Sequence, residues 1–419
     1  MKIALVNYRY FISGGPETYM FNIKEILEHH GHEVIPFSVK HNKNVKNDHE
    51  HYFLEPIGTG NEIYNHEYPT DLKTRVKVIG RMLYSFEAKQ KFKKFLSDIK
   101  PDIVYILHFQ NKLSCSIIDT AIEQNIPVVQ RISDFGHICP NAHFYRKQKG
   151  ICTECIEKNL FRAIKNKCIS DSYAHSVLKT FSLSIMNFRK VKEKVSAFIF
   201  PSTSTLQKYK EAGFDIQKLH HIPTFFNAKK LAEKKTLSYG DFALYIGRIE
   251  KEKGVETLID AFLKTNYKLK IIGFSNNNYA ADLRKKIIGK EDQIVFLGKL
   301  DFSEISHYLE ECLFTVVPSE WFENFPNTVL ESFAFSKAVL ATNIGSLPEI
   351  VNETNGFCFD YASSESLKEK VEFMFNHPDE AKEKGENGQL LLNTIFSAET
   401  HYNQLISIFN KLICAESDK

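Results

Sequence analysis

The sequence lacks the features of several protein classes. Among its 419 residues, no apolar stretch approaches the roughly 20 residues that cross a bilayer, and the N-terminal apolar run is shorter than that of a signal peptide. There is no internal repeat or low-complexity tract, and its 19 Gly and 13 Pro are too few for a fibre or a disordered chain. We therefore expect a folded cytoplasmic protein of two domains, because the chain is too long for one core.

Two ligand-binding motifs are also absent. The turn after the first predicted strand has no Gly-x-Gly-x-x-Gly, which argues against a nicotinamide dehydrogenase. No Asp-x-Asp pair occurs anywhere, so the sequence does not indicate a diphosphate held by a metal ion. Cationic side chains would take the place of the metal, and we expect phosphate binding without one.

Charge is distributed unevenly along the chain. Residues 1–228 carry 32 Lys and Arg against 22 Asp and Glu, whereas the rest carries 22 against 29, which the net charge of +3 conceals. This asymmetry suggests that only the first half faces an anionic surface or substrate. Residues 73–94 mix cations with apolar side chains, as does a helix resting on anionic lipid, so we expect peripheral membrane association. A solvated helix face fits the same pattern.

Short apolar runs alternate with helical patterns, which predicts an α/β protein. The runs are continuously apolar, as in parallel strands covered on both faces. Strands are predicted within 2–8, 33–39, 102–107, 126–132 and 196–202, and again within 242–248, 269–274, 293–298, 313–319, 338–342 and 356–359. Helices are predicted at 16–31, 257–263, 327–335 and 398–413.

Each series of strands predicts one doubly wound domain. The polar stretch 227–241 separates them, so we expect an N-terminal domain at 1–228 and a second domain at 229–394. Residues 395–419 are expected to form a helix that packs back toward the N-terminal domain. The two Rossmann-like domains should face each other across a cleft, with ligand at the carboxyl ends of the strands.

The stretch "SEWFENFPNTVLESF", residues 319–333, places two glutamates around a predicted helix start. Pro326 and Asn327 suit that start, whose backbone amides and dipole favour a phosphate. Glu331 would lie one turn inside the helix and Glu323 just outside it, where carboxylates can accept hydrogen bonds from ribose and sugar hydroxyls. As isolated residues, both also fit surface or capping acids.

A second stretch, "YIGRIEKEKG", supplies two cations. Arg248 and Lys253 flank a turn after the first strand of the second domain. Together they can neutralise a leaving diphosphate, with the Arg bidentate and the Lys as a point charge.

The motifs "GRIEKEKG", "PSEWFENFPNTVLESFA" and "IGSLPEIV", with "SGGPET" near the N-terminus, resemble family 4 of the nucleotide-sugar glycosyltransferases, which have the GT-B fold. The resemblance implies that Arg248 and Lys253 bind the donor diphosphate, Glu323 the transferred sugar and Glu331 the ribose. It also implies that the amides of Asn324 and Phe325 cradle the sugar and phosphate, next to Pro326 and Asn327. By the same resemblance, the domain at 1–228 would bind the acceptor and the domain at 229–394 the nucleotide sugar.

The first half contributes a glycine pair and one departure from the family pattern. Gly14 and Gly15 follow the opening strand, where they permit close backbone approach to a phosphate or an acceptor; a plain strand-to-helix turn is the alternative. Ser133 stands where relatives commonly have a His, so it offers only a hydroxyl to the sugar. His108 and His137 are the candidate substitutes.

Four cysteines have the spacing of a metal site. Cys139 and Cys152 are separated by twelve residues, as are Cys155 and Cys168, around the Cys-x-x-Cys knuckle. This spacing predicts a structural zinc in a Cys-rich insertion at about 137–170, with an iron–sulfur cluster or unligated thiols as alternatives.

These inferences combine into one predicted activity. The resemblance implies a retaining glycosyltransferase that moves a sugar from a UDP- or GDP-sugar to a glycan or lipid-linked acceptor in bacterial surface polysaccharide synthesis, without nucleic acid as a partner. A non-catalytic sugar-nucleotide-binding partner or scaffold, and a GT-B sugar-nucleotide epimerase, remain alternatives.

Overall fold

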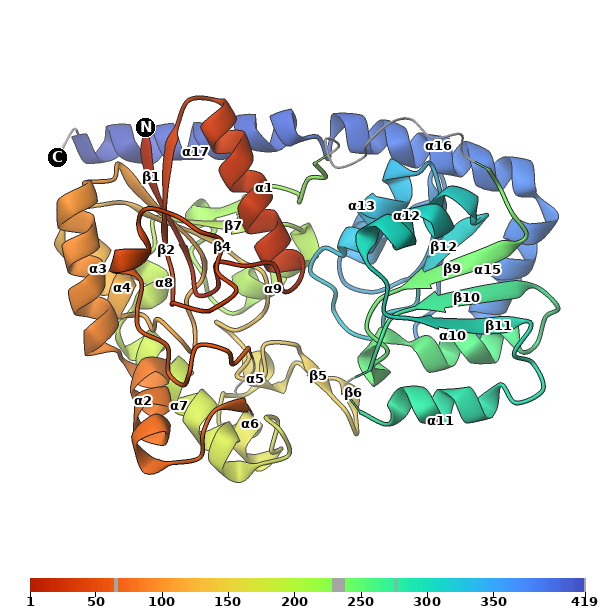
Figure 1. Cartoon of the computed structure of the whole chain (residues 1–419), viewed down its shortest axis with the longest axis horizontal. Coiled ribbons are helices and arrows are strands. Elements are labelled where there is room, and N and C mark those ends of the chain that lie inside the picture. Colours follow the sequence, from red (N-terminus) through yellow and green to blue (C-terminus); the bar gives the residue numbers. More distant parts are fainter. Residues whose placement is uncertain (64–66, 228–237, 276, 418–419) are drawn as a thin grey trace.

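The computed structural model describes residues 1–63, 67–227, 238–275 and 277–417, and it places two α/β halves side by side (Figure 1). The predicted domain boundary at residue 228 lies outside the described residues. Within those residues, no helix combines the length and the apolar character that crossing a bilayer requires.

The N-terminal half is built on a six-stranded parallel sheet in the order β2-β1-β3-β4-β7-β8. Its strands are β1 (Lys2–Asn7), β2 (Glu33–Phe37), β3 (Ile103–His108), β4 (Val128–Arg131), β7 (Ala197–Phe200) and β8 (Leu219–His221). Its helices are α1 (Gly15–His29), α2 (Leu72–Leu83), α3 (Phe86–Ile99), α4 (Ser116–Glu123), α7 (Tyr173–Phe188), α8 (Val191–Lys194) and α9 (Thr203–Glu211). The strands are buried on both faces, as their continuous apolar runs predict.

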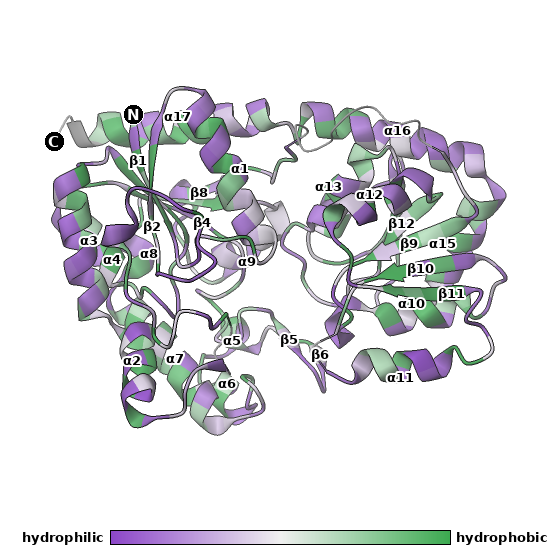
Figure 2. Ribbon diagram, in the orientation of Figure 1, coloured by the Kyte–Doolittle hydropathy of each residue, from purple (hydrophilic) through white to green (hydrophobic). Residues whose placement is uncertain are grey.

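The C-terminal half repeats this plan with a parallel sheet in the order β11-β10-β9-β12-β13-β14. Its strands are β9 (Phe242–Ile246), β10 (Lys268–Ile272), β11 (Ile294–Gly298), β12 (Phe314–Val317), β13 (Ala338–Thr342) and β14 (Gly356–Phe359). Its helices are α10 (Val255–Phe262), α11 (Tyr279–Lys286), α12 (Phe302–Glu311), α13 (Asn327–Ala334), α14 (Leu347–Ile350), α15 (Ser364–Asn376) and α16 (Pro378–Thr394). Figure 2 shows the hydrophobic strands enclosed by helices with polar outer faces.

In each sheet the strand order reverses beside the first strand, between β1 and β3 and between β9 and β12. Loops that leave the carboxyl ends of two such strands diverge, and the gap between them is the usual ligand site of doubly wound folds. All eleven predicted strands are confirmed. β8, which is three residues long, was not predicted.

The Cys-rich insertion between β4 and α7 has short elements of its own. A two-stranded hairpin of β5 (Tyr145–Arg146) and β6 (Gly150–Ile151) is followed by the single turns α5 (Glu154–Glu157) and α6 (Arg162–Lys165). In Figure 1 the hairpin extends from the N-terminal half toward the C-terminal half.

The last helix, α17 (Ala398–Ser417), returns from the C-terminal half and lies along the N-terminal half (Figure 1). Leu405 and Phe409 are fully buried in the cluster that includes Ile3 and Leu5 of β1. The buried His401 ring hydrogen-bonds through Nε2 to the Tyr19 hydroxyl, at 2.8 Å, and through Nδ1 to a backbone carbonyl at 2.7 Å. This helix therefore fastens the end of the chain to the opposite half.

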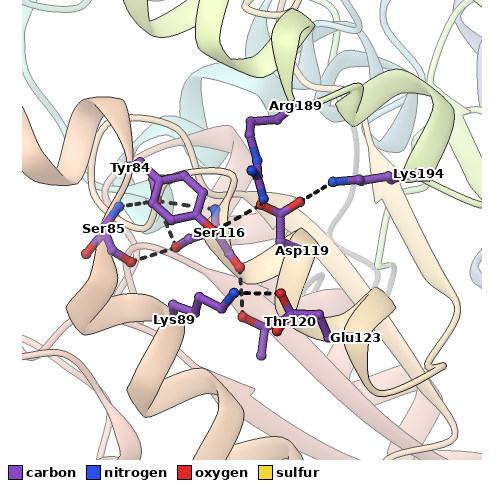
Figure 3. Close-up of polar contacts among 10 residues, drawn as sticks. Tyr84, Ser85, Lys89, Ser116, Asp119, Thr120, Glu123, Arg189 and Lys194 are labelled. Atoms are coloured by element: carbon purple, nitrogen blue, oxygen red, sulfur yellow. Dashed lines mark hydrogen bonds and ion pairs between the residues drawn. The ribbon is translucent and has the colours of Figure 1, made fainter.

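A buried carboxylate joins several helices of the N-terminal half (Figure 3). Asp119 of α4 accepts a hydrogen bond from the Tyr84 hydroxyl at 3.0 Å and pairs with Arg189 at 2.6 Å and Lys194 at 2.5 Å. Burial raises the pKa of Asp119, but these partners outweigh it and hold the pKa below its ordinary value. The residues that follow α2 and α7 are thus fixed to the same point.

Candidate functional site

The carboxyl ends of both sheets open into one cleft with a volume of about 590 Å³. The N-terminal half contributes Ser13, Gly14, Gly15, Tyr19, Arg131 and Ser133, among others. The C-terminal half contributes Arg248, Lys253, the run Glu323–Thr328, and Glu331. The structure therefore brings together all the predicted donor-site residues, from motifs up to 83 positions apart.

An ion pair occupies the centre of the C-terminal wall. Lys253 Nζ lies 2.6 Å from Glu323 Oε1, and the Ser319 hydroxyl donates to the same oxygen at 2.6 Å. Glu323 is only 7% exposed, and burial raises its pKa, yet Lys253 and Ser319 outweigh this effect and the pKa is lowered. The carboxylate is therefore charged at neutral pH, and the ammonium, 4.7 Å from the centre of the Trp321 ring, is held at the cleft.

Two glycines allow this pair to form. Gly254, next to Lys253, has φ of 66°, and a Cβ there would lie 1.8 Å from the Pro318 carbonyl oxygen. Gly345 has φ of 60°, and its Cβ would lie 3.2 Å from the backbone N and O of Glu323. Because glycine takes up this backbone conformation without strain, the two turns pack directly on the loop that follows β12 and carries Glu323.

Helix α13 begins at the cleft, with a small correction to the expected start. Pro326 is the N-cap and Asn327 the first helical residue, so Asn327 does not cap the helix, and no side chain accepts a hydrogen bond at the cap. The positive end of the helix therefore has backbone amides that can bind an anion. Glu331 lies one turn in, as expected, and lines the cleft.

Arg248 reaches the cleft with a partly exposed side chain. Its guanidinium lies 3.7 Å from Glu252, and 45% of its side chain is accessible. An exposed pair at this distance holds its partners weakly, so the guanidinium can turn to a ligand.

The glycine pair of the first half lies opposite the start of α13. A Cβ on Gly15 would be 3.2 Å from Asn327 Nδ2, so the two halves approach closely here. Asn324 bridges them directly: its Oδ1 accepts from the Thr205 hydroxyl at 2.6 Å, and its Nδ2 donates to the Ile132 carbonyl at 3.1 Å. Phe325 packs on Phe396, with ring centroids 5.6 Å apart.

Ser133 lines the cleft but is engaged by an arginine that the sequence reasoning missed. The buried Arg131 donates from Nη1 to Ser133 Oγ at 2.9 Å and from Nη2 to Thr224 Oγ1 at 2.7 Å, and lies 3.8 Å over the Tyr19 ring. Arg131 lies at the end of a predicted strand, and this position could have indicated that its side chain reaches the cleft.

The structure does not bring the two candidate histidines into the cleft lining. His108 lies behind Asp134, with Nε2 3.5 Å from its Oδ2. His137 is buried among aromatic rings and hydrogen-bonds Gln130 at 2.8 Å, and burial lowers its pKa to about 4. The histidine that does line the cleft is His143 of the insertion, which packs 4.9 Å from the Trp321 ring.

The four predicted metal ligands are free thiols that lie close to one another. The hydrogen bond between Cys155 and Cys139 raises the pKa of Cys155, as do burial and the neighbouring Cys168 and Cys152. The same hydrogen bond lowers the pKa of Cys139 to about 7. Across the described residues, no three His, Cys, Asp or Glu side chains have the arrangement of a metal site. The zinc site therefore stays a prediction.

Comparison with known proteins matches residues 227–391 to the family "Glycosyl transferases group 1". An uncharacterized glycosyltransferase of Methanocaldococcus jannaschii is 34% identical over 36% of this chain and 42% of its own length. An uncharacterized protein in the cps region of Klebsiella pneumoniae is 25% identical over 84% of this chain and 87% of its own length. The capsular polysaccharide biosynthesis glycosyltransferase CapM of Staphylococcus aureus is 27% identical over 61% of this chain and 63% of its own length.

Solved structures match the whole chain. Sucrose-phosphate synthase of Thermosynechococcus elongatus has a TM-score of 0.70 at 17% identity and covers 99% of both chains. Anabaena HepE in complex with UDP has a TM-score of 0.64 at 16% identity and covers 98% of this chain and all of its own. At these identities the likeness concerns the fold, and it confirms the predicted GT-B arrangement.

Proposed function

Because residues 227–391 match the family "Glycosyl transferases group 1" and the chain has a GT-B fold, we propose that this protein transfers a sugar from a UDP- or GDP-sugar to an acceptor hydroxyl during surface polysaccharide synthesis. The observation that carries the proposal is the Lys253–Glu323 pair at the start of α13. CapM, a relative, is a capsular polysaccharide glycosyltransferase, and HepE was solved with UDP, which supports both the pathway class and the donor class.

The cleft residues suit distinct parts of such a donor. Lys253, Arg248 and the first amides of α13 would bind the diphosphate, where negative charge grows as the sugar departs. Glu331 would accept hydrogen bonds from the ribose and Glu323 from the transferred sugar. Because two cations and the start of a helix lie together and can neutralise the diphosphate, we expect the protein to bind its donor even when a chelator has removed metal ions.

The proposed reaction retains the anomeric configuration. The bond between the sugar C1 and the β-phosphate oxygen breaks, and its electron pair stays on the phosphate. The acceptor oxygen forms the new bond to C1 on the same face, and its proton passes to that phosphate oxygen. The cations and helix amides stabilise the developing anion, so this step requires no protein base.

Release of nucleoside diphosphate tests the proposal. The purified protein, with a panel of UDP- and GDP-sugars and a mixed glycan acceptor pool, is expected to release UDP or GDP by transfer or slow hydrolysis. Loss of this release on Lys253→Ala would assign it to the cleft. Donor binding without release from any sugar nucleotide would favour the non-catalytic partner, and donor conversion without acceptor would favour an epimerase.

As a separate proposal, the four cysteines hold a structural zinc that gives the polar insertion a core. Four thiolates are a typical zinc donor set, although they also suit an iron–sulfur cluster. Elemental analysis should find about one zinc per chain, lost on Cys152→Ser together with a lower Tm. A metal-free protein whose Tm does not respond to a chelator would contradict it.

A further inference from the structure

Many of the exposed apolar side chains of the N-terminal half lie on a few neighbouring helices. Of the eighteen large apolar side chains that are exposed in the described part of the chain, nine come from α2, α7 and the residues that begin α3 or precede α6. Figure 1 places α2, α6 and α7 together at the lower end of this half. We name the exposed sides of α2 and α7 the α2–α7 face.

The apolar residues of α2 form one stripe. Leu72, Val76 and Ile79 are spaced by four and three positions, so they share a helix side, and all three are exposed, Leu72 by 78%. The exposed Lys73 and Arg75 lie on either side of this stripe, and α2 contains no acidic residue. This composition is typical of a helix that lies in a membrane interface.

The structure changes the expectation for residues 73–94. They form two helices that part at Tyr84 and Ser85, where the cation-rich α3 begins. In α3, Lys89 and Lys94 pair with Glu123 and Asp98 at 2.6 Å, so the structure directs these cations to protein partners. Only α2 keeps the predicted character, and the second contributor is a helix that the sequence reasoning did not consider.

That second helix is α7. Tyr173, Val177 and Phe181 recur every four residues on one side, and Phe188, 84% exposed, continues the same side near the helix end. No Asp or Glu occurs in α7, and the whole stretch 162–190 has six basic residues and one acidic.

The two stripes belong to one rigid frame. The Ser182 hydroxyl of α7 donates to the Met82 carbonyl of α2 at 2.7 Å. The Asp119 network in Figure 3 also binds Tyr84 and Arg189, the residues that follow α2 and α7. Because these contacts join α2 to α7 and fix the residues that follow both helices, the two apolar stripes are held in a fixed relation to each other.

We propose that the α2–α7 face docks on an anionic lipid bilayer. The apolar stripes lie on helices that carry cations and no acidic residues. Such helices suit an anionic bilayer, whose apolar interior lies beneath a layer of negatively charged headgroups. A second copy of this chain is a poorer occupant, because the pairing would bring like charges together. Asp171, which precedes α7, borders a cavity that shares His143 and Trp321 with the cleft, so docking would bring the cleft near the bilayer.

Vesicle cosedimentation of the full chain tests this proposal without any requirement for catalysis. The protein should bind vesicles of phosphatidylcholine mixed with phosphatidylglycerol, bind far less to phosphatidylcholine alone, and dissociate as salt rises. We expect the double variants Val177→Ser/Phe181→Ser and Lys73→Glu/Arg75→Glu each to weaken binding by about tenfold or more. The matched control is Ile288→Ser/Phe302→Ser, which changes exposed apolar residues of the other half.

Three outcomes would overturn the proposal. One is no binding to the anionic vesicles at low salt, and another is an equal loss in the control variant. The third is a dimer in light scattering that the Val177→Ser/Phe181→Ser variant dissociates without any vesicle binding, which would assign the face to a second copy. An unchanged Tm for the variants excludes misfolding. If the variants keep their thermal shift with sugar nucleotides, the loss of vesicle binding is independent of the proposed donor site.

Discussion

At the scale of single residues, the sequence was most informative where a motif carries its own backbone geometry. Lys253, Glu323 and Glu331 were predicted from a strand end, a Pro-Asn helix start and the family resemblance of their motifs, and all three line the cleft. His143 was missed because its place depends on how the insertion folds beside the cleft, which no local pattern encodes. Arg131 was missed although it ends a predicted strand, where a side chain can reach the cleft. His108 and His137 were candidates to contact the sugar, and neither lines the cleft: His108 lies beside Asp134, and His137 is buried among aromatic rings.

Lys253 should matter most to catalysis. Lys253→Ala removes the ammonium from the developing diphosphate charge and leaves Glu323 as a buried carboxylate without its cation, so kcat/KM should fall by about 10² or more. Arg248→Ala should lower kcat/KM by a similar order, because it also removes a cation from the developing diphosphate charge. Steady-state kinetics with the preferred donor measures both.

The neighbouring Lys251 provides the control, because it is exposed and does not line the cleft. Lys251→Ala should turn over like the unmodified protein. Near-normal turnover of Lys253→Ala would remove the proposed role of this cation.

His143 should contribute more modestly. Its ring lines the cleft where Ser133 offers only a hydroxyl already bonded to Arg131, so the imidazole is placed to hydrogen-bond the sugar. We expect His143→Ala to lower kcat/KM about tenfold, the value of one hydrogen bond in the transition state. His307→Ala, an exposed site on α12, serves as control, and equal kinetics for the two variants would exclude the role.

At the scale of elements, the continuous apolar runs predicted every long strand, and the expected helices appear at their expected places. The short β8 and the pieces of the insertion were not predictable. Each has too few residues for a periodicity to be recognised.

Helix α17 should respond to acid through His401. Burial lowers the pKa of this ring to about 3 from an ordinary 6.5, so the folded protein holds it neutral while the unfolded chain takes up a proton. The stabilisation is complete above pH 6.5 and is lost as the pH falls toward 3. Between pH 7 and pH 5 this one residue should cost about 2 kcal/mol of unfolding free energy.

Urea unfolding of the His401→Gln variant isolates that effect. The variant should be less stable than the unmodified protein at pH 7, because Tyr19 and the Pro223 carbonyl lose a partner, and the difference should shrink by pH 5. His307→Gln should leave the pH dependence unchanged. A difference that stays constant with pH would show that His401 does not titrate as described.

At the scale of the whole molecule, each sheet has a point where its strand order reverses, and the loops at these two points face one another. Each sheet therefore contributes half of a shared cleft. For the proposed function, the sugar, base and acceptor that fit would depend on side chains from both walls at once. The sequence therefore predicted the class of ligand from its cations and carboxylates, while the direct bridge of Asn324 to Thr205 and Ile132 became visible only in the structure.

The central claim is that a sugar nucleotide binds in this cleft with its diphosphate between the halves. A crystal structure of the protein soaked with the UDP- or GDP-sugar that most raises its Tm tests this most directly. We predict diphosphate oxygens within hydrogen-bond distance of Lys253 Nζ, the Arg248 guanidinium and the first amides of α13, with the ribose on Glu331. A nucleotide ordered elsewhere, with the cleft filled by its own side chains, would contradict the account.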